Sequence, residues 1–318
     1  MHLKFSIIIP FKDVNINILK CLRSITKLNY KKFEVILVPD QEITLDEKIN
    51  FDYTIIPSGA IMPGLKRDLA SKKATGDVLA FLDDDAQPSV DWLTIANHFF
   101  SIKNEKIIGG PGIDTSKDDK NFIQNLSDIF FKSKFFGVPD RYLISNKEKY
   151  YDDWPSVNLM IKKDIFNSIG GFNTNHWPGE DTVLCSKLKE IDISILYIPK
   201  LFVYHIRRIN LQKLTKQIFN YGFKRGIFFF EYPNNSRKIK FFIPTAFTFY
   251  LISNFFFTNI IYQLPLLIYV LISTYNYLNF NKNFFGLLVF PIFCIYNHIV
   301  YGIAHLFGLL SKILPKND

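Results

Sequence analysis

Three adjacent carboxylates, Asp83, Asp84 and Asp85, are the side chains of this sequence best suited to chemistry. They directly follow an apolar run at 78–82 that has the length of a buried strand. Adjacent carboxylates repel one another, whereas a hard divalent cation bridges carboxylate and phosphate oxygens and removes that repulsion. The triplet therefore predicts a metal site that also receives a diphosphate. The alternative is a charged turn in which Asp85 or Ser89 caps the next helix.

The elements before the triplet predict where its carboxylates lie. Strand patterns occur at 5–10, 33–38, 53–57 and 78–82, and helical patterns at 16–28 and about 64–75. This alternation predicts an α/β fold with a doubly wound, mostly parallel sheet. Ligands of such sheets bind beyond the carboxyl ends of the strands, so Pro10, Asp40 and the triplet are expected along one edge. Because no glycine fingerprint follows the first strand, a metal is expected to hold the phosphates.

A second pair of acids, Glu180 and Asp181, begins a segment with the helical periodicity of Val183, Leu184 and Leu188. Acids in a first helical turn stabilise the helix electrostatically, which is one explanation of the pair. The other is general-base chemistry, in which a carboxylate accepts a proton from an attacking hydroxyl. Spacing alone leaves both explanations open.

The C-terminal third is strongly apolar. Residues 241–281 contain no Asp, Glu, Lys, Arg or His, and residues 283–311 contain no Asp, Glu, Lys or Arg. Each stretch exceeds the roughly 20 residues that cross a hydrocarbon core. We therefore expect transmembrane helices at about 241–259, 263–280 and 284–310, with two crossings or a re-entrant hairpin as alternatives for the first stretch. Buried core helices are disfavoured because no charged face is available.

A basic segment precedes the apolar region. The chain carries a formal net charge of +9, and residues 206–240 contain nine Lys or Arg side chains against the single acid Glu231. This composition predicts a basic amphipathic segment at the membrane interface, attracted to anionic membrane lipids. Nucleic-acid binding would also suit a basic chain, but no reader motif is present, so no nucleic-acid partner is expected. The predicted organisation is a catalytic domain at 1–205, the interfacial segment at 206–240 and membrane helices at 241–311.

The start of the chain predicts the side of the membrane. A strand pattern begins at Phe5 with no preceding signal peptide, so the catalytic domain is expected on the cytoplasmic side of the cytoplasmic membrane. Cys21, Cys185 and Cys294 lie far apart in the sequence and form no paired spacing. They predict neither a disulfide framework nor a zinc site.

Several motifs in order give the chain a family resemblance. They are Ser6 to Pro10, Asp40, Gly64 to Asp68, Ala74 to Asp85, Trp154 to Met160, Gly170 to Phe172 and Gly179 to Thr182. In this order they resemble the family 2 glycosyltransferases, which have the GT-A nucleotide-sugar fold. The C-terminal segment 297–310 is similar to the last helix of the succinoglycan-biosynthesis type of membrane glycosyltransferase.

The resemblance implies a nucleotide-diphosphate sugar as donor and assigns roles to residues. Contacts to the donor are expected from Pro10, Asp40, Arg67, Asp68, Asp83 and Asp84. The expected ligands of Mn²⁺ or Mg²⁺ are Asp83, Asp85 and His205, and the expected catalytic residues are Glu180 and Asp181, with Asp181 as general base. Two alternatives remain at this point: Arg67 is an exposed helix residue, and His205 is structural.

Three departures from the family pattern affect the predicted function. Gln41 and Glu42 follow Asp40, so the base-binding loop is expected to differ, and Asp68 stands where Asn is common. Residues 217–222 stand in place of the Gln-x-x-Arg-Trp motif of processive synthases. Transfer of one or a few sugars is therefore expected rather than polymerisation.

These observations predict a membrane-bound, inverting, metal-dependent glycosyltransferase with a lipid-linked saccharide as acceptor in glycan or polysaccharide assembly. Inversion is expected because no covalent nucleophile is evident beside the proposed base. A polyprenyl-phosphate glycosyl synthase is the alternative enzyme, since its phosphate acceptor needs no base. A catalytically inactive membrane-anchored binding or scaffold protein is the alternative of another class.

Overall fold

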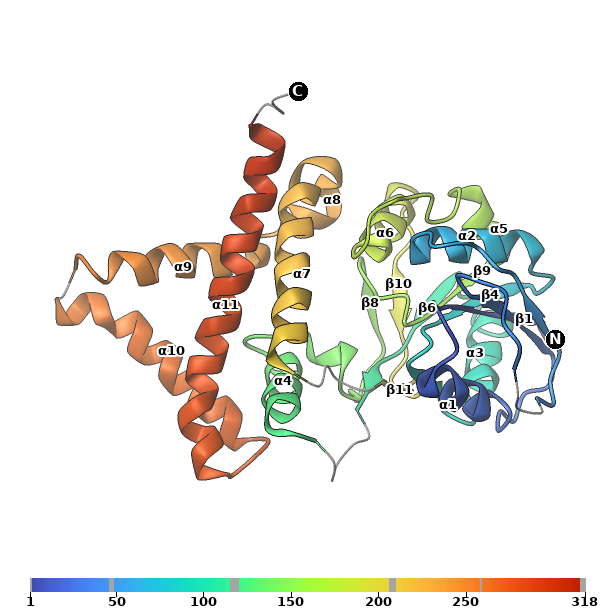
Figure 1. Cartoon of the computed structure of the whole chain (residues 1–318), viewed down its shortest axis with the longest axis horizontal. Coiled ribbons are helices and arrows are strands. Elements are labelled where there is room, and N and C mark those ends of the chain that lie inside the picture. Colours follow the sequence, from blue (N-terminus) through green and yellow to red (C-terminus); the bar gives the residue numbers. More distant parts are fainter. Residues whose placement is uncertain (1, 46–48, 115–119, 206–209, 258, 315–318) are drawn as a thin grey trace. The chain divides into compact units, whose positions relative to one another are not determined.

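The computed structural model describes residues 2–45, 49–114, 120–205, 210–257 and 259–314 (Figure 1). The chain forms two compact units. The N-terminal unit comprises residues 1–115 and 140–206, and the C-terminal unit comprises residues 116–139 and 207–318. Residues 116–139, which fall inside the expected 1–205 domain, therefore belong with the C-terminal helices.

An eight-stranded mixed sheet forms the centre of the N-terminal unit. Its order is β3 (Tyr53–Ile55), β2 (Phe33–Val38), β1 (Phe5–Pro10), β4 (Val78–Leu82), β9 (Asn158–Lys162), β6 (Ile107–Gly109), β10 (Ile195–Tyr197) and β8 (Lys149–Tyr151). The first four strands are mutually parallel, whereas β9 runs antiparallel to both β4 and β6. The parallel half carries the carboxyl ends of β1, β2 and β4 to one edge.

Helices cover both faces of this sheet. Figure 1 shows α1 (Ile16–Ile25) and α3 (Trp92–Ser101) on one face, and α2 (Pro63–Lys73), α5 (Lys163–Ser168) and α6 (Glu180–Glu190) on the other. Because successive strand residues point to opposite faces, Ile7 and Ile9 of β1 pack in the core that includes α1, and Ile8 packs in the core that includes α2. Burial on both faces explains why the parallel strands are continuously apolar.

A small second sheet adjoins the carboxyl end of β4. It consists of β5 (Ala86–Pro88), β11 (Val203–His205) and β7 (Gly112–Ile113), with β11 in the middle. The antiparallel register pairs His205 with Ala86. This pairing brings the last residue of β11 next to the aspartate triplet, although the two are far apart in the sequence.

The C-terminal unit is helical. It contains α4 (Phe122–Lys132), α7 (Leu211–Glu231), α8 (Pro233–Ser236), α9 (Ile243–Ser253), α10 (Ile260–Leu278) and α11 (Phe284–Ile313). Helix α7 packs along α11, and a Cβ atom added to Gly226 would lie 2.3 Å from the carbonyl oxygen of His305. Glycine at this position therefore permits the close approach of the two helix backbones.

The predicted membrane segments fall on helices of different length. Among the described residues, two helices, α10 and α11, are long and apolar enough to cross a membrane. The segment predicted to cross at 241–259 contains the shorter apolar helix α9, whose 11 residues span about 16 Å, and its crossing stays a prediction. Residue 258, and residues 206–209 of the expected interfacial segment, lie outside the described residues.

Candidate active site

The ends of three neighbouring strands bring the expected nucleotide-site residues to one edge. Pro10 ends β1, Asp40 lies two residues beyond β2, and Asp83 directly follows β4. The side chain of Asp83 is 35% exposed and that of Asp85 is 24% exposed, so both carboxylates reach the surface of this edge. The parallel sheet therefore gathers carboxylates that are far apart in the sequence.

Asp85 and His205 form a close pair. The Nε2 atom of His205 lies 3.1 Å from Oδ1 of Asp85, and each side chain is about one-quarter exposed. The pairing of β11 with β5 produces this proximity, because His205 is in register with Ala86. A carboxylate oxygen and an imidazole nitrogen thus face the same small region beside the aspartate triplet.

The donor set fits an oxygen-preferring divalent cation that is completed by a substrate. Within the described ranges, no three side chains of His, Cys, Asp or Glu converge into a ready-made metal cage. Mg²⁺ and similar cations at diphosphates use only one or two carboxylates, together with phosphate oxygens and waters. Burial and the neighbouring charges of Asp85 and Asp83 raise the pKa of Asp84 to about 6. A cation here would relieve that repulsion, and Asp85 with His205 would hold it.

Arg67 connects the aspartate triplet with the Glu180 motif. Its side chain on α2 is only 2% exposed, and its Nη2 donates to Oδ1 of Asp83 at 2.6 Å while Nη1 donates to Oε1 of Glu180 at 3.2 Å. Burial opposes the charge, but Asp83 and Glu180 raise the pKa of Arg67 above its ordinary value. Arg67 is therefore a buried link between two acidic parts of the site, and the exposed-helix alternative does not describe it.

Glu180 and Asp181 open α6 but have different surroundings. Glu180 is 6% exposed, and its two carboxylate oxygens accept from Arg67 and from the backbone N–H of Gly179. Within the described part of the chain, Asp181 has a buried Oδ1 with no hydrogen-bond partner. Burial and the adjacent charge of Glu180 raise the pKa of Asp181 to about 7. A carboxylate with an unused oxygen and a pKa near neutrality is suited to accept a proton.

Lys66 is a site residue that the sequence analysis missed. This side chain is 3% exposed, and its Nζ donates to the carbonyl oxygens of Phe11 and Val38 and to the carboxylate of Asp40. It thus ties the ends of β1 and β2 together and fixes the expected nucleotide-binding carboxylate. Lys66 lies next to Arg67 and four residues before the buried Ala70, which places it on the inner side of α2. This helical spacing is the sequence signal that could have identified it as a site residue.

Asp68 lies on the same helix but faces a loop. Its carboxylate accepts from the backbone N–H groups of Phe172 at 2.8 Å and Asn173 at 2.7 Å. Burial raises the pKa of Asp68, and these two N–H groups act in the opposite direction. The described contacts therefore make Asp68 an anchor for the loop that follows Gly170 and Gly171. That loop leads towards Glu180.

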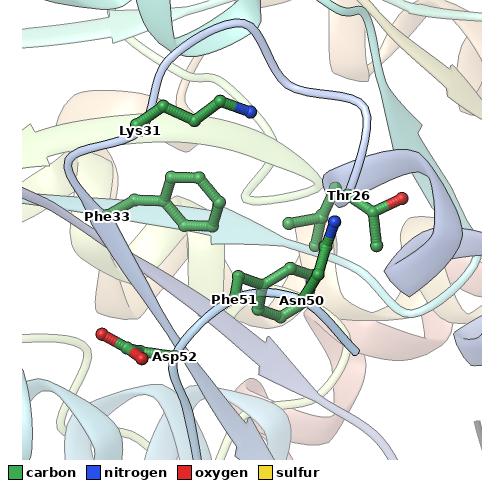
Figure 2. A pocket seen from close by; sticks show the side chains of 7 residues that line it. Thr26, Lys31, Phe33, Asn50, Phe51 and Asp52 are labelled. Atoms are coloured by element: carbon green, nitrogen blue, oxygen red, sulfur yellow. The ribbon is translucent and has the colours of Figure 1, made fainter. Parts of the chain in front are cut away.

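A separate hollow lies at the opposite ends of the strands. Figure 2 shows it between the end of α1, the start of β2 and the segment before β3, lined in part by Thr26, Lys31, Phe33 and Asn50. Since β2 and β3 are parallel, this hollow lies away from Asp40. It contains none of the expected site residues.

The comparisons with known proteins identify the class of fold and domain. Residues 6–163 match the family described as glycosyl transferase family 2. The chain also resembles the structure of the mannosyltransferase PcManGT from Pyrobaculum calidifontis in complex with GDP-Man and Mn²⁺, with a TM-score of 0.60, 12% identity, and coverage of 96% of this chain and 88% of that one. The predicted GT-A fold is confirmed, and residues 6–163 are a glycosyltransferase family 2 domain.

Two curated relatives from Haloferax volcanii are also similar. The glucosyl-dolichyl phosphate glucuronosyltransferase is 22% identical over 240 residues, covering 68% of this chain and 73% of the relative. The glycosyltransferase AglE is 24% identical over 224 residues, covering 67% of this chain and 70% of the relative. The similarity thus extends to both relatives over more than two thirds of their lengths.

The ion pairs of the buried Arg67 with Asp83 and Glu180 predict that loss of the guanidinium strongly lowers stability. Replacing Arg67 by Met leaves Asp83 and Glu180 without their shared cation, so we expect Arg67→Met to lower the unfolding free energy by about 3–5 kcal/mol. Denaturant unfolding in detergent, followed by tryptophan fluorescence, measures this, because Trp92, Trp154 and Trp177 all lie in the N-terminal unit. Lys72→Met, on the exposed side of α2, is the matched control and should change stability by less than about 0.5 kcal/mol. Equal stability of the two variants would refute the link.

Proposed function

We propose that this chain is an inverting, metal-dependent glycosyltransferase that moves a sugar from a nucleotide-diphosphate sugar to a lipid-linked saccharide at the cytoplasmic face of the membrane. The family 2 domain supports the glycosyl transfer. The PcManGT structure is a complex with GDP-Man and Mn²⁺, and one relative is named for a dolichyl phosphate substrate. The apolar helices α10 and α11 support a membrane location.

The observation that carries the proposal is the link from Asp83 through Arg67 to Glu180. It joins the carboxylates at the end of β4 to the acids that open α6, within one compact unit. A donor site and an acceptor-side base must lie close together for a single displacement. This arrangement supports transfer better than a charged turn would, because a charged turn needs no buried partner in α6.

The donor would lie along the sheet edge. Asp40, oriented by Lys66, and Pro10 would contact the nucleoside, and Asp83 and Asp84 would lie beside the diphosphate. Mn²⁺ or Mg²⁺, when bound by Asp85 and His205, supplies positive charge that stabilises the leaving diphosphate. Arg67 fixes the orientation of Asp83, and Asp68 holds the loop before Glu180.

Asp181 would act as the general base. Its carboxylate takes the proton of the acceptor hydroxyl while that oxygen forms a bond to the anomeric carbon. The bond from the anomeric carbon to the diphosphate oxygen breaks in the same displacement, and the bonding electrons leave with the nucleoside diphosphate. One displacement inverts the anomeric centre. Glu180 positions Arg67 and raises the pKa of Asp181.

A polyprenyl-phosphate glycosyl synthase is the competing enzyme, and it also fits the family. Its acceptor is already an anion, so it would not require a base. The unused Oδ1 of Asp181, together with a raised pKa, favours the hydroxyl acceptor. An inactive scaffold would keep the Asp85–His205 pair, because the pairing of β11 with β5 produces it, so donor binding and activity must distinguish this alternative.

Released nucleoside diphosphate tests the proposal. We expect the detergent-purified protein, given UDP-, GDP- and dTDP-sugars with a membrane lipid extract, to release diphosphate from one donor only when Mn²⁺ or Mg²⁺ is added. Asp85→Asn should lose at least about a hundredfold in rate, since it removes a metal ligand. Asp164→Asn, an exposed aspartate, is the matched control and should retain the wild-type rate.

The other outcomes separate the alternatives. Release that is supported by purified polyprenyl phosphate but not by lipid-linked saccharide would establish the synthase. No release and no metal-dependent binding of any donor would support the scaffold. Release that persists without metal and in Asp85→Asn would contradict the assigned metal site.

The raised pKa of Asp181 predicts the pH profile. Below pH about 7 the carboxyl holds its proton and cannot act as a base, so kcat/KM should rise as pH increases and level off above about 7. Asp181→Asn should reduce kcat/KM by a factor of about 10²–10⁴ and abolish its rise with pH. Glu190→Gln, at the other end of α6, should keep the wild-type profile. A flat wild-type profile between about pH 5.5 and 8.5 would disprove the role.

A further inference from the structure

Helices α9 and α10 of the C-terminal unit bury polar side chains and expose apolar ones. Helix α9 buries Thr245 and Thr248, whereas Ile243, Phe249 and Ile252 are more than half exposed. Helix α10 likewise buries Ser273 and Asn276 and exposes most of its leucine and isoleucine side chains. Water would oppose this distribution, and a lipid environment favours it. The outer surface of this unit is therefore suited to acyl chains.

Helix α11 exposes one apolar face. Its exposed large side chains are Phe284, Phe285, Leu288, Ile292, Ile303, Phe307, Leu310 and Ile313. Phe285, Leu288 and Ile292 are three or four residues apart, as are the exposed large residues from Ile303 to Ile313. This spacing places each group on one side of the helix. Its buried residues include Cys294, Asn297 and His305, which face the protein. The exposed apolar side chains thus form two groups on the exposed side, at 285–292 and 303–310, and the residues 293–302 between them are buried or half-buried.

Two other helices contact α11, and the first of them, α4, also reaches Phe285 at the start of the exposed face. Near the start, the rings of Phe122 in α4 and Phe285 have centroids 5.3 Å apart, and those of Phe130 and Phe293 are 6.2 Å apart. Further on, α7 takes over: the hydroxyls of Thr215 and Tyr296 are 2.7 Å apart, and Lys312 pairs with Glu231 at the far end. Neighbouring helices thus line α11 from Phe285 to Lys312.

Both accompanying helices carry charge. In α4, Asp128 accepts from Lys132 at 2.6 Å and from Lys120, just before the helix, at 2.7 Å. In α7, Lys213 and Lys216 are exposed. If α11 crossed the bilayer, these charges would enter the hydrocarbon with it, which is unfavourable. If α11 lies parallel to the surface, its apolar face contacts lipid while α4 and α7 remain on the aqueous side.

Helices α9 and α10 form a hairpin that ends in an apolar turn. The hydroxyl of Tyr250 donates to the carbonyl of Tyr262 at 2.8 Å, and the rings of Phe247 and Tyr269 stack 4.5 Å apart. Figure 1 shows both helices projecting from α11 and meeting at their connecting turn. Phe255, Phe256 and Phe257 in that turn are 87%, 78% and 57% exposed.

Backbone polar groups beside this turn have hydrogen-bond partners within the protein. The side chain of Gln263 donates to the carbonyl of Phe257 at 3.1 Å, and Asn259 accepts from the backbone N–H of Ile261. Irregular backbone is tolerated at membrane depth only where such internal partners exist. The feet of the hairpin are basic, with Arg237, Lys238 and Lys240 before α9 and Lys282 after α10. Basic feet and an apolar tip indicate insertion from one side.

We propose that the chain is anchored without crossing the membrane: α11 lies in the interface with its apolar face on the acyl chains, and the α9–α10 hairpin inserts into the same leaflet. The 11 residues of α9 span about 16 Å, roughly half of a 30 Å hydrocarbon core, so α9 limits the depth of the hairpin. The 19 residues of α10 span about 28 Å, so α10 would run obliquely within the leaflet. Both feet of the hairpin and both ends of α11 then lie on one side. This inference concerns the membrane surface and does not rest on the proposed transfer reaction.

Cysteine labelling with a membrane-impermeant maleimide tests the arrangement in the full-length protein. The native cysteines Cys21, Cys185 and Cys294 are buried, so the wild type reports the background. The variants are Lys103→Cys in the N-terminal unit, Lys282→Cys between α10 and α11, and Ser311→Cys near the end of α11. All three should react equally in sealed vesicles of one orientation and be protected in the opposite orientation. Labelling of Lys282→Cys and Ser311→Cys from opposite sides would establish a crossing and overturn the proposal.

A depth measurement keeps the proposal testable if Lys282→Cys is shielded in both orientations. Tryptophan placed at Leu288, Ile299 or Phe307 of α11 reports depth through quenching by lipids brominated at known acyl positions. For a helix in the interface, all three should be quenched most by shallow bromines, above the quenching of the three native tryptophans. A crossing helix would place Ile299 deepest, and preferential deep quenching there alone would refute the arrangement.

Discussion

The buried guanidinium of Arg67 is the interaction on which the candidate site depends. A charge that is 2% exposed requires compensation, and Asp83 and Glu180 supply it from distant parts of the chain. The end of β4, the inner face of α2 and the start of α6 must therefore keep fixed relative positions. Lys66, one residue away, fixes Asp40 in the same manner. Consecutive cations on one helix thus organise the acids at the sheet edge.

The C-terminal unit follows a different physical rule. Its helices bury Thr245, Ser273, Asn297 and His305, although many large apolar side chains of α9, α10 and α11 are exposed. The unit also has a buried apolar cluster of its own, so its exposed apolar surface comes in addition to a core and is suited to lipid. Helices α7 and α11 share a buried apolar cluster that includes Ile218 and Phe293, and the glycines Gly226 and Gly308 permit close approach of the two backbones.

The sequence allowed the doubly wound sheet and its edge to be predicted, because strand periodicity is local and parallel strands end at a common edge, and the family resemblance implied the GT-A fold. Contacts across the chain could not be predicted. Nothing local distinguishes Arg67 as a buried link from Arg67 on a surface, and the anchoring of Phe172 by Asp68 depends on the tertiary fold. Apolar composition also does not determine where a helix ends: α9 ends at Ser253, inside the segment predicted at 241–259.

Affinity for a nucleoside diphosphate with Mn²⁺ tests most directly whether the two acidic parts of the site act as one. Because Glu180 shares Arg67 with Asp83, Glu180→Gln leaves the whole guanidinium charge to Asp83 and should weaken this binding by about tenfold, within the roughly 0.5–3 kcal/mol typical of coupled residues. Asp181→Asn leaves both hydrogen bonds of Arg67 in place and should bind within about twofold of the wild type. Wild-type affinity in Glu180→Gln would contradict the account.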